Sequence, residues 1–193
     1  MTKIRDRDQL VEAAARVFAR KGFDSASMED IAAEVGVLQG SLYYHVSSKA
    51  ELLFLVQHRR LMAINAALDE IADSAEPPAE KLRHAIGEHL HYLETNYPES
   101  RNWFTEPGRG TDNGDARDDI RELNHRYGGI WVRIIREGIE SGAFRAGVDP
   151  GTVARGILGM CNWVPRWYRR EGARSIDEII ADLSEMAVRG LLP

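Results

Sequence analysis

The sequence predicts an all-α protein, with an N-terminal three-helix domain of the helix-turn-helix type followed by a larger C-terminal helical domain. Apolar residues recur every three or four positions, as they do on one face of an α-helix. Capping motifs mark helix starts, and no stretch alternates in the two-residue period of a strand. Proline and glycine breaks divide the chain into about nine helices. We expect the two domains to comprise residues 1–50 and 51–193.

Two short helices on a tight turn are predicted between Met28 and Lys49. The first begins an apolar stripe at Met28, and Ser27 and Asp30 have the spacing of a capping box at its start. Gly36 follows the stripe, and glycine most readily takes the left-handed backbone conformation that ends a helix. A second helix can therefore begin almost at once.

The second helix is predicted to bury Leu38, Leu42 and Val46, which recur at four-residue spacing. Its remaining side chains suit a DNA groove, because amides and hydroxyls hydrogen-bond base edges and phosphates, and a glycine lets the backbone approach closely. The predicted DNA-binding residues are Ser27, Gln39, Gly40, Ser41, Tyr43, Tyr44, His45 and Lys49. Packing of the two tyrosines beneath a neighbouring helix is the structural alternative.

The next helix is predicted to open with Ser48 and Glu51 as a capping pair, which places Lys49 in its first turn. There the ammonium is expected to meet a DNA phosphate. The N-terminus is also basic, through Lys3, Arg5 and Arg7. The whole chain carries a net charge of −5, so a small basic reading surface on an acidic protein fits site-specific binding better than general nucleic-acid binding. An ordinary solvated terminus would have the same composition.

The remainder of the chain is predicted to stay helical, with breaks at Pro77-Pro78, Pro98, 107–115, 142–147 and Gly172. Asp149 followed by Pro150 is typical of a helix start, and Ser175 with Glu178 repeats the capping-box spacing. The last two helices carry apolar stripes with small residues that permit close helix approach. An antiparallel pair of this kind either completes its own subunit or meets its copy in a four-helix interface. The predicted dimerisation residues are Val153, Gly156, Ile157, Met160, Ile179, Ile180, Leu183 and Met186.

The C-terminal part combines aromatic side chains with arginines, a mixture that suits an apolar ligand with an anionic group. Aromatic walls bury rings or hydrocarbon, and the guanidinium fork binds carboxylate or phosphate. The predicted ligand-binding residues are Trp103, Phe104, Tyr127, Trp131, Asn162, Trp163, Arg166, Trp167 and Arg169. The same aromatic residues would also serve a core or a dimer interface, and the arginines a solvated surface.

Composition limits the function classes further. No apolar run reaches the roughly 18 residues of a membrane span, and we expect no secretory signal, because no apolar run follows the basic residues at the N-terminus. The single cysteine, Cys161, lies in an apolar helical stretch, which indicates an inert buried thiol in a reducing cytoplasm. The sequence contains no Ser-His-Asp set, phosphate-cradling glycine loop or zinc-type spacing. We therefore expect no catalytic residue, no metal and no cofactor.

Residues 11–53 as a whole resemble the N-terminal domain of TetR-type (tetracycline-repressor-like) transcriptional regulators. The residues that carry this resemblance are Ala14, Phe18, Gly22, Phe23, Ile31, Ala32, Gly36, the run GSLYYH, Ser48, Lys49 and Leu52. Leu38, Gln39 and Val46 depart from the family pattern. The resemblance implies a homodimeric repressor that binds a near-palindromic double-stranded operator and is released by a small effector.

A second resemblance, carried by GVLQGSLYYH, GIESGAFRAGVD and NWVPRWYRREG, is to the branch of this family that responds to acyl-CoA thioesters in fatty-acid and steroid breakdown. By motif position it places Arg166, Trp167 and Arg169 near the ligand, whereas Arg170-Glu171 departs from the branch pattern. A sensor of aromatic drugs that controls efflux and a DNA-binding protein without an effector are the alternatives within the family.

An enzyme is the alternative from another class. Glu88 with His91 and Glu122 with His125 have the E-x-x-H spacing of di-iron helical bundles. Such a site also needs a carboxylate from each of two further helices, and nothing in the sequence marks these as inward.

Overall fold

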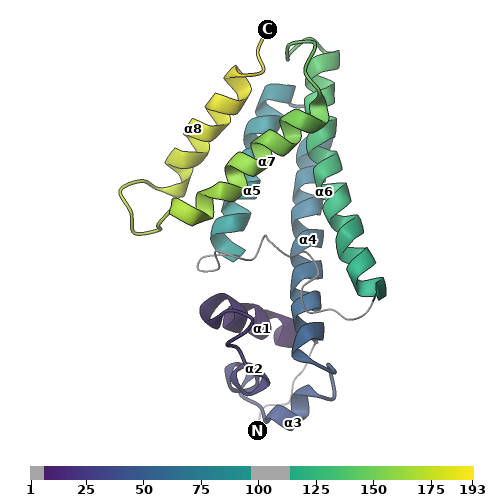
Figure 1. Cartoon of the computed structure of the whole chain (residues 1–193), viewed down its shortest axis with the longest axis vertical. Helices are drawn as coiled ribbons and strands as arrows, with labels where there is room; N and C mark the ends of the chain where they lie inside the picture. The colour runs from purple at the N-terminus through teal and green to yellow at the C-terminus, as the bar shows by residue number, and fades with distance from the viewer. Residues whose placement is uncertain (1–6, 97–113) are drawn as a thin grey trace. The chain divides into compact units, whose positions relative to one another are not determined.

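The computed structural model describes residues 7–96 and 114–193, which form eight helices and, within these ranges, no strand (Figure 1). The helices are α1 Arg7–Lys21, α2 Met28–Val35, α3 Gln39–Leu42, α4 Lys49–Asp73, α5 Pro78–Asn96, α6 Gly114–Glu140, α7 Pro150–Trp167 and α8 Ile176–Arg189. The predicted all-α fold is thus confirmed. The described residues divide into two compact units, 7–61 with 114–122 and 62–96 with 123–193. None of the described helices is both long and apolar enough to cross a membrane.

The first unit is built on α1, α2, α3 and the beginning of α4. Its core gathers apolar side chains from all four helices, among them Phe18, Ile31, Leu42 and Leu52. The predicted capping box is present at α2, where the Ser27 hydroxyl accepts from the Asp30 amide and the Asp30 carboxylate accepts from the Ser27 amide.

The turn after α2 has the predicted left-handed glycine, since Gly36 has φ 78° and donates to the carbonyls of Ala32 and Ala33. The helix that follows is shorter than expected, because α3 ends at Leu42. Leu42 and Val46 are buried as predicted, but the prediction that Leu38 is buried is wrong, since its side chain is 62% exposed. Leu38 caps α3 with an extended backbone (φ −76°, ψ 143°), so helical spacing does not apply to it.

The second unit packs α5 against α7 and α8, with α6 contributing its part from residue 123 onward. Trp131 and Phe144 are the largest side chains in its interior. The predicted starts of the last two helices are confirmed. Asp149 accepts from the Thr152 amide at 2.8 Å, and Ser175 forms a capping box with Glu178. Cys161 is buried as expected, and burial raises the pKa of its thiol to about 12, so the thiol stays protonated at neutral pH.

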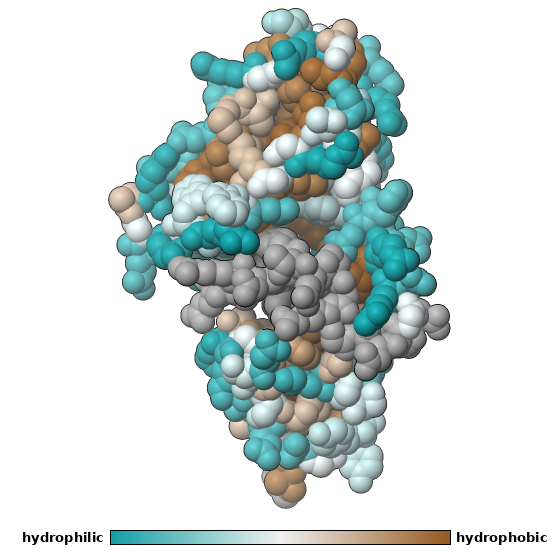
Figure 2. Space-filling model, in the orientation of Figure 1, coloured by the Kyte–Doolittle hydropathy of each residue, from teal (hydrophilic) through white to brown (hydrophobic). Residues whose placement is uncertain are grey.

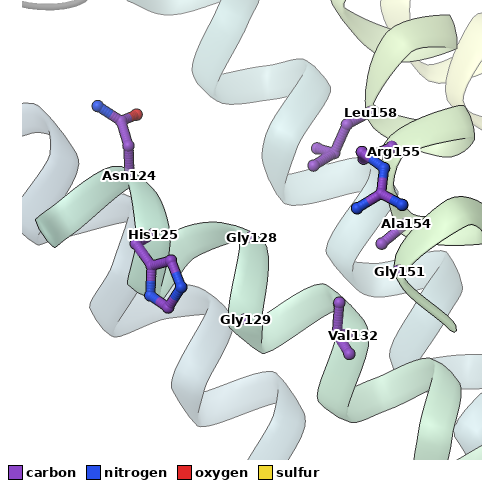
Figure 3. Close-up of a pocket in the computed structure, with 9 residues that line it drawn as sticks. All are labelled: Asn124, His125, Gly128, Gly129, Val132, Gly151, Ala154, Arg155 and Leu158. Atoms are coloured by element: carbon purple, nitrogen blue, oxygen red, sulfur yellow. The ribbon is translucent and has the colours of Figure 1, made fainter. Parts of the chain in front are cut away.

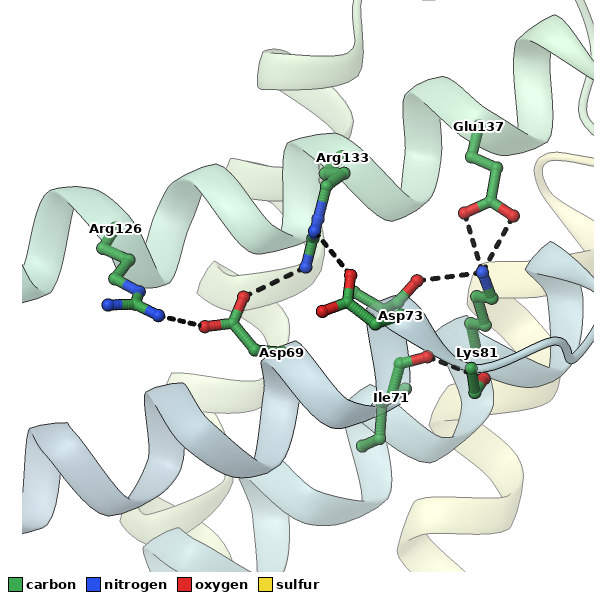
Figure 4. Close-up of polar contacts among 9 residues, drawn as sticks. Asp69, Ile71, Asp73, Lys81, Arg126, Arg133 and Glu137 are labelled. Atoms are coloured by element: carbon green, nitrogen blue, oxygen red, sulfur yellow. Dashed lines mark hydrogen bonds and ion pairs between the residues drawn. The ribbon is translucent and has the colours of Figure 1, made fainter.

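A buried lysine and a ladder of ion pairs join three helices of this unit (Figure 4). The Lys81 side chain of α5 is 5% exposed and donates to the Ala72 carbonyl at the end of α4 and to both Glu137 oxygens on α6, at 2.8–2.9 Å. Beside it, Arg133 of α6 donates to Asp69 and Asp73 of α4. A buried ammonium is tolerated only when it is paired and hydrogen-bonded. The bonds of Lys81 therefore favour the present spacing of these three helices, since moving them apart would leave the ammonium unpaired.

Replacing Lys81 with Met should therefore destabilise the protein, by about 2 kcal/mol, since it removes charge-assisted bonds to a buried carbonyl and to Glu137. Urea denaturation of the purified protein measures the change. Arg121→Met is the matched control, because it removes an exposed pair with Asp118 and should change the free energy of unfolding by less than about 0.5 kcal/mol. Equal losses in both variants would contradict a specific role for Lys81.

Candidate functional site

The first candidate site is the exposed surface of the first unit around α3. Tyr44 is 91% exposed and Tyr43 and His45 are exposed beside it, so the tyrosine pair does not pack beneath another helix of this unit. Figure 2 shows hydrophobic surface at the end of this unit that carries α3. No atom lies within 4 Å of a side chain added at Gly40, which leaves the backbone there open to a partner. Gln39 and Ser41 are half-buried on the same short helix.

The cations of α1 are largely engaged with acids of the same unit. Arg16 and Arg20 both donate to Glu34 at 2.8 Å, and these bonds hold the pKa of the Glu34 carboxyl below its usual range. Lys21 donates to Asp30, which lowers the pKa of that carboxyl to about 2. Arg7 pairs with Glu51. The other predicted basic residues, Lys3 and Arg5, lie outside the described residues.

Lys49 has a different surrounding from the one that the sequence predicts. Its ammonium donates to the carbonyls of Phe23 at 2.7 Å, Ala26 at 2.8 Å and Asp24 at 3.4 Å, and it lies 4.4 Å from the centre of the Phe23 ring. An ammonium has three donors, and the three carbonyls use them all. In this structure Lys49 fastens the start of α4 to the turn between α1 and α2, which also carries the Ser27 cap.

Replacing Lys49 with Met should lower the free energy of unfolding by about 1–2 kcal/mol in the absence of DNA, because the turn carbonyls lose a charged donor. Thermal and urea unfolding of the free protein measure this loss. A lysine that only contacts phosphate gives the opposite pattern: unchanged stability, weaker DNA binding and a salt dependence reduced by about one ion. Lys49→Met tells the two roles apart.

The second candidate site lies in the interior of the second unit, where three predicted ligand residues meet a histidine. The Tyr127 hydroxyl lies 2.5 Å from His89 Nδ1, and His89 Nε2 lies 3.0 Å from Asn162 Oδ1. Trp131 packs edge-on to the His89 ring, with ring centres 5.9 Å apart. These residues come from α5, α6 and α7. We call His89, Tyr127, Trp131 and Asn162 the interior cluster.

Sequence reasoning missed His89, although a signal for it existed. The residue falls on the apolar stripe of α5, between Ile86 and Leu90, both of which are buried. A polar side chain on a core stripe requires hydrogen-bond partners, and these are supplied by Tyr127 and Asn162 from two other helices.

The protonation of the interior cluster follows from its burial. Desolvation lowers the pKa of His89 to about 4, against a smaller opposing effect of the bond to Asn162, so the imidazole is neutral at neutral pH. Because Asn162 Oδ1 can only accept, Nε2 carries the proton and the Tyr127 hydroxyl donates to Nδ1. Among the described residues, the buried Trp131 Nε1 has no hydrogen-bond partner.

Four of the other predicted ligand residues lie on the surface. Trp163 and Trp167 are 58% and 50% exposed, and the Arg166 guanidinium lies 4.6 Å from the centre of the Trp163 ring. Arg169 is exposed and donates to the Tyr168 carbonyl. The predicted ligand set therefore divides into an interior, uncharged group and an exposed, cationic group at the end of α7. Trp103 and Phe104 lie outside the described residues.

The predicted dimerisation residues also divide. Ile157 and Ile179 are buried within this subunit, so they belong to its core. Gly156 and Met186 are exposed. The half-buried members are Val153, Met160, Ile180 and Leu183. Figure 2 shows hydrophobic surface over the region where Figure 1 draws α7 and α8.

An open groove of about 450 Å³ runs between α6 and α7 (Figure 3). Its lining residues are Asn124, His125, Gly128, Gly129, Val132, Gly151, Ala154, Arg155 and Leu158. The groove contains none of the predicted ligand-binding residues, and much of its wall is glycine and alanine.

The predicted di-iron alternative has no ligand set in the described part of the chain. There, no three His, Cys, Asp or Glu side chains are grouped so that they could hold a metal ion. Glu122 and His125 are exposed, and His91 lies 3.3 Å from the Asp177 carboxylate.

Comparison with known proteins gives a consistent result across the chain. The family model described as tetracyclin repressor-like, C-terminal domain, matches residues 75–191, and the model of bacterial regulatory proteins of the tetR family matches residues 10–56. The HTH-type transcriptional repressor KstR2 of Mycolicibacterium smegmatis is 31% identical over 174 residues, covering 90% of this chain and 84% of that protein. The fatty acid metabolism regulator protein of Bacillus subtilis is 23% identical over 95% of this chain and 94% of its own length. The solved structure of the ketosteroid transcriptional regulator KstR2 of Mycobacterium tuberculosis superposes with a TM-score of 0.81 at 27% identity, over 98% of this chain and 97% of that chain.

Proposed function

Because the chain belongs to the TetR family of transcriptional regulators, and its relatives include named repressors rather than enzymes, we propose that it is a homodimeric repressor released from its operator by a small effector. The observation that carries the DNA-binding part is the exposure of Tyr44 in the turn that follows α3, together with the open backbone of Gly40 on α3 itself, which comes after a capped helix and a left-handed turn. Such a surface enters a major groove with its side chains toward base edges and phosphates. Ser27, Gln39, Ser41, Tyr43 and His45 complete the proposed contact surface.

The proposed dimer uses the exposed parts of α7 and α8. Gly156 is exposed and has no side chain, so a second helix can approach closely there. Met186 and Trp163 are exposed apolar side chains that a dimer interface would bury. A two-fold axis would repeat the α3 surface, so that two copies engage the two halves of a near-palindromic site.

The proposed effector is an acyl-CoA thioester of fatty-acid or steroid origin. The interior cluster and its apolar surroundings suit the acyl part, and the exposed Arg166 and Arg169 suit phosphate groups. The names of two relatives, a ketosteroid regulator and a fatty acid metabolism regulator, support this class over an aromatic drug.

The experiment that tests this function begins with selection of a binding duplex from random DNA. Fluorescence anisotropy should then show Tyr44→Ala binding that duplex about tenfold more weakly, with unchanged thermal stability, because an exposed side chain is lost from the contact surface. Leu192→Ala, an exposed change near the C-terminus, is the control and should bind normally. Addition of dodecanoyl-CoA should release the DNA, whereas CoA alone should not. Equal affinity of Tyr44→Ala and the parent protein would contradict the placement of the DNA surface.

The dimer is tested with two glycines that have open space around them. Gly156→Arg should give a monomer in analytical ultracentrifugation, because a charged side chain would enter the proposed interface. Gly129→Arg, on α6 in the groove, should remain dimeric. If Gly156→Arg remains a dimer and Gly129→Arg becomes a monomer, the interface lies at the groove and not at α7 and α8.

A further inference from the structure

The indole N–H of Trp131 is the starting point, because it is a buried donor without a partner among the described residues. A buried donor left unpaired costs about 1–3 kcal/mol, so native proteins rarely keep one without a reason. The Trp131 side chain is fully buried and packs against both His89 and Tyr127. The N–H therefore belongs to the interior cluster and cannot turn to solvent.

Asn162 adds a second set of donors to the same place. Its oxygen accepts from His89, which leaves its amide nitrogen to donate elsewhere. His89 and Tyr127 satisfy each other and fix the orientation of the Asn162 amide. The cluster thus has one buried donor without an acceptor among the described residues, Trp131 Nε1, and a second donor in the Asn162 amide.

An uncharged acceptor fits the described contacts of the cluster best. The hydrogen bonds and ring contacts described for the cluster involve no cation, and His89 is held neutral by its burial. Burying a carboxylate or phosphate without a cation costs several kcal/mol. A carbonyl oxygen of a ketone, ester or thioester accepts two hydrogen bonds and carries no charge.

We infer that the interior cluster binds a carbonyl oxygen of the effector, with Trp131 Nε1 and the Asn162 amide as its two donors. This inference rests on the proposed function, and it separates the effector into two parts. The apolar, carbonyl-bearing part lies inside, and the anionic part lies outside at Arg166 and Arg169, which form no ion pair within the described residues. His89 and Tyr127 are positioning residues, because they orient Asn162 without needing to contact the ligand.

Two matched ligands test the inference on the unaltered protein. Dodecanoyl-CoA has a thioester carbonyl, and S-dodecyl-CoA is the thioether that lacks it. Isothermal titration calorimetry should show the thioester binding about fivefold more tightly, the effect of one or two net hydrogen bonds. A neutral steroid diketone serves as a third probe. If the variants described below weaken binding of the diketone but not of the thioester, the carbonyl that the cluster binds is a ring ketone.

Trp131→Phe removes the donor and keeps an aromatic ring, and Asn162→Asp removes the amide donors and keeps the oxygen for His89. Each variant should bind the carbonyl ligand about fivefold more weakly and bind DNA as the parent protein does. Trp131→Phe should bind S-dodecyl-CoA as tightly as the parent protein does. Equal loss for both ligands in Trp131→Phe would show that the residue acts through packing alone and overturn the inference. Equal affinity of the parent protein for thioester and thioether, together with no effect of Trp131→Phe on any probe, would also overturn it. If no probe binds the parent protein, the proposed effector function fails instead.

Discussion

The contact on which the surface around α3 depends is the set of hydrogen bonds between the Lys49 ammonium and the carbonyls of the turn before α2. A helix as short as α3 cannot hold its own shape, because a single turn gains too few hydrogen bonds to offset the entropy of fixing it. Its position is therefore imposed by neighbours: the capped α2 before it, Gly36 between them, and α4 after it. Lys49 joins the last of these to the turn that begins the arrangement, so the α3 surface is held in place by contacts within the chain itself.

The parts of the fold that the sequence predicted well are those encoded locally. Ser27, Gly36, Asp149 and Ser175 each act on atoms within four residues, and all four helix boundaries were correctly predicted. Leu38 was misplaced because spacing alone does not show where a helix begins, and one extended residue rotates a side chain out of the stripe. The domain boundary after residue 50 and the site assignments stay predictions.

The contacts that escaped prediction join residues distant in the chain. The partners of Lys49 lie 23 to 26 residues earlier, and those of His89 lie 38 and 73 residues later. The pattern of aromatic and basic residues at the end of α7 predicted a ligand site, which stays a proposal. It did not show that the arginines would face outward while Asn162 turned toward α5. Under the proposed function that division would matter for recognition, because a buried, uncharged cluster disfavours charged molecules that an arginine-lined site would accept.

The turn that follows α6 brings Phe144 against Gly138, and this packing restricts which residues position 138 can hold. The ring of Phe144 lies so close to Gly138 that any side chain at 138 would overlap it, and the next residue, Arg145, donates its amide to the Leu191 carbonyl near the C-terminus. Gly128 and Gly129 on the same helix have open space instead. A genetic screen for loss of repression would therefore recover replacements at 138 that touch neither DNA nor effector and act by unfolding the helical unit. In such a screen, the loss of regulation alone does not identify a recognition residue, and protein abundance has to be measured alongside it.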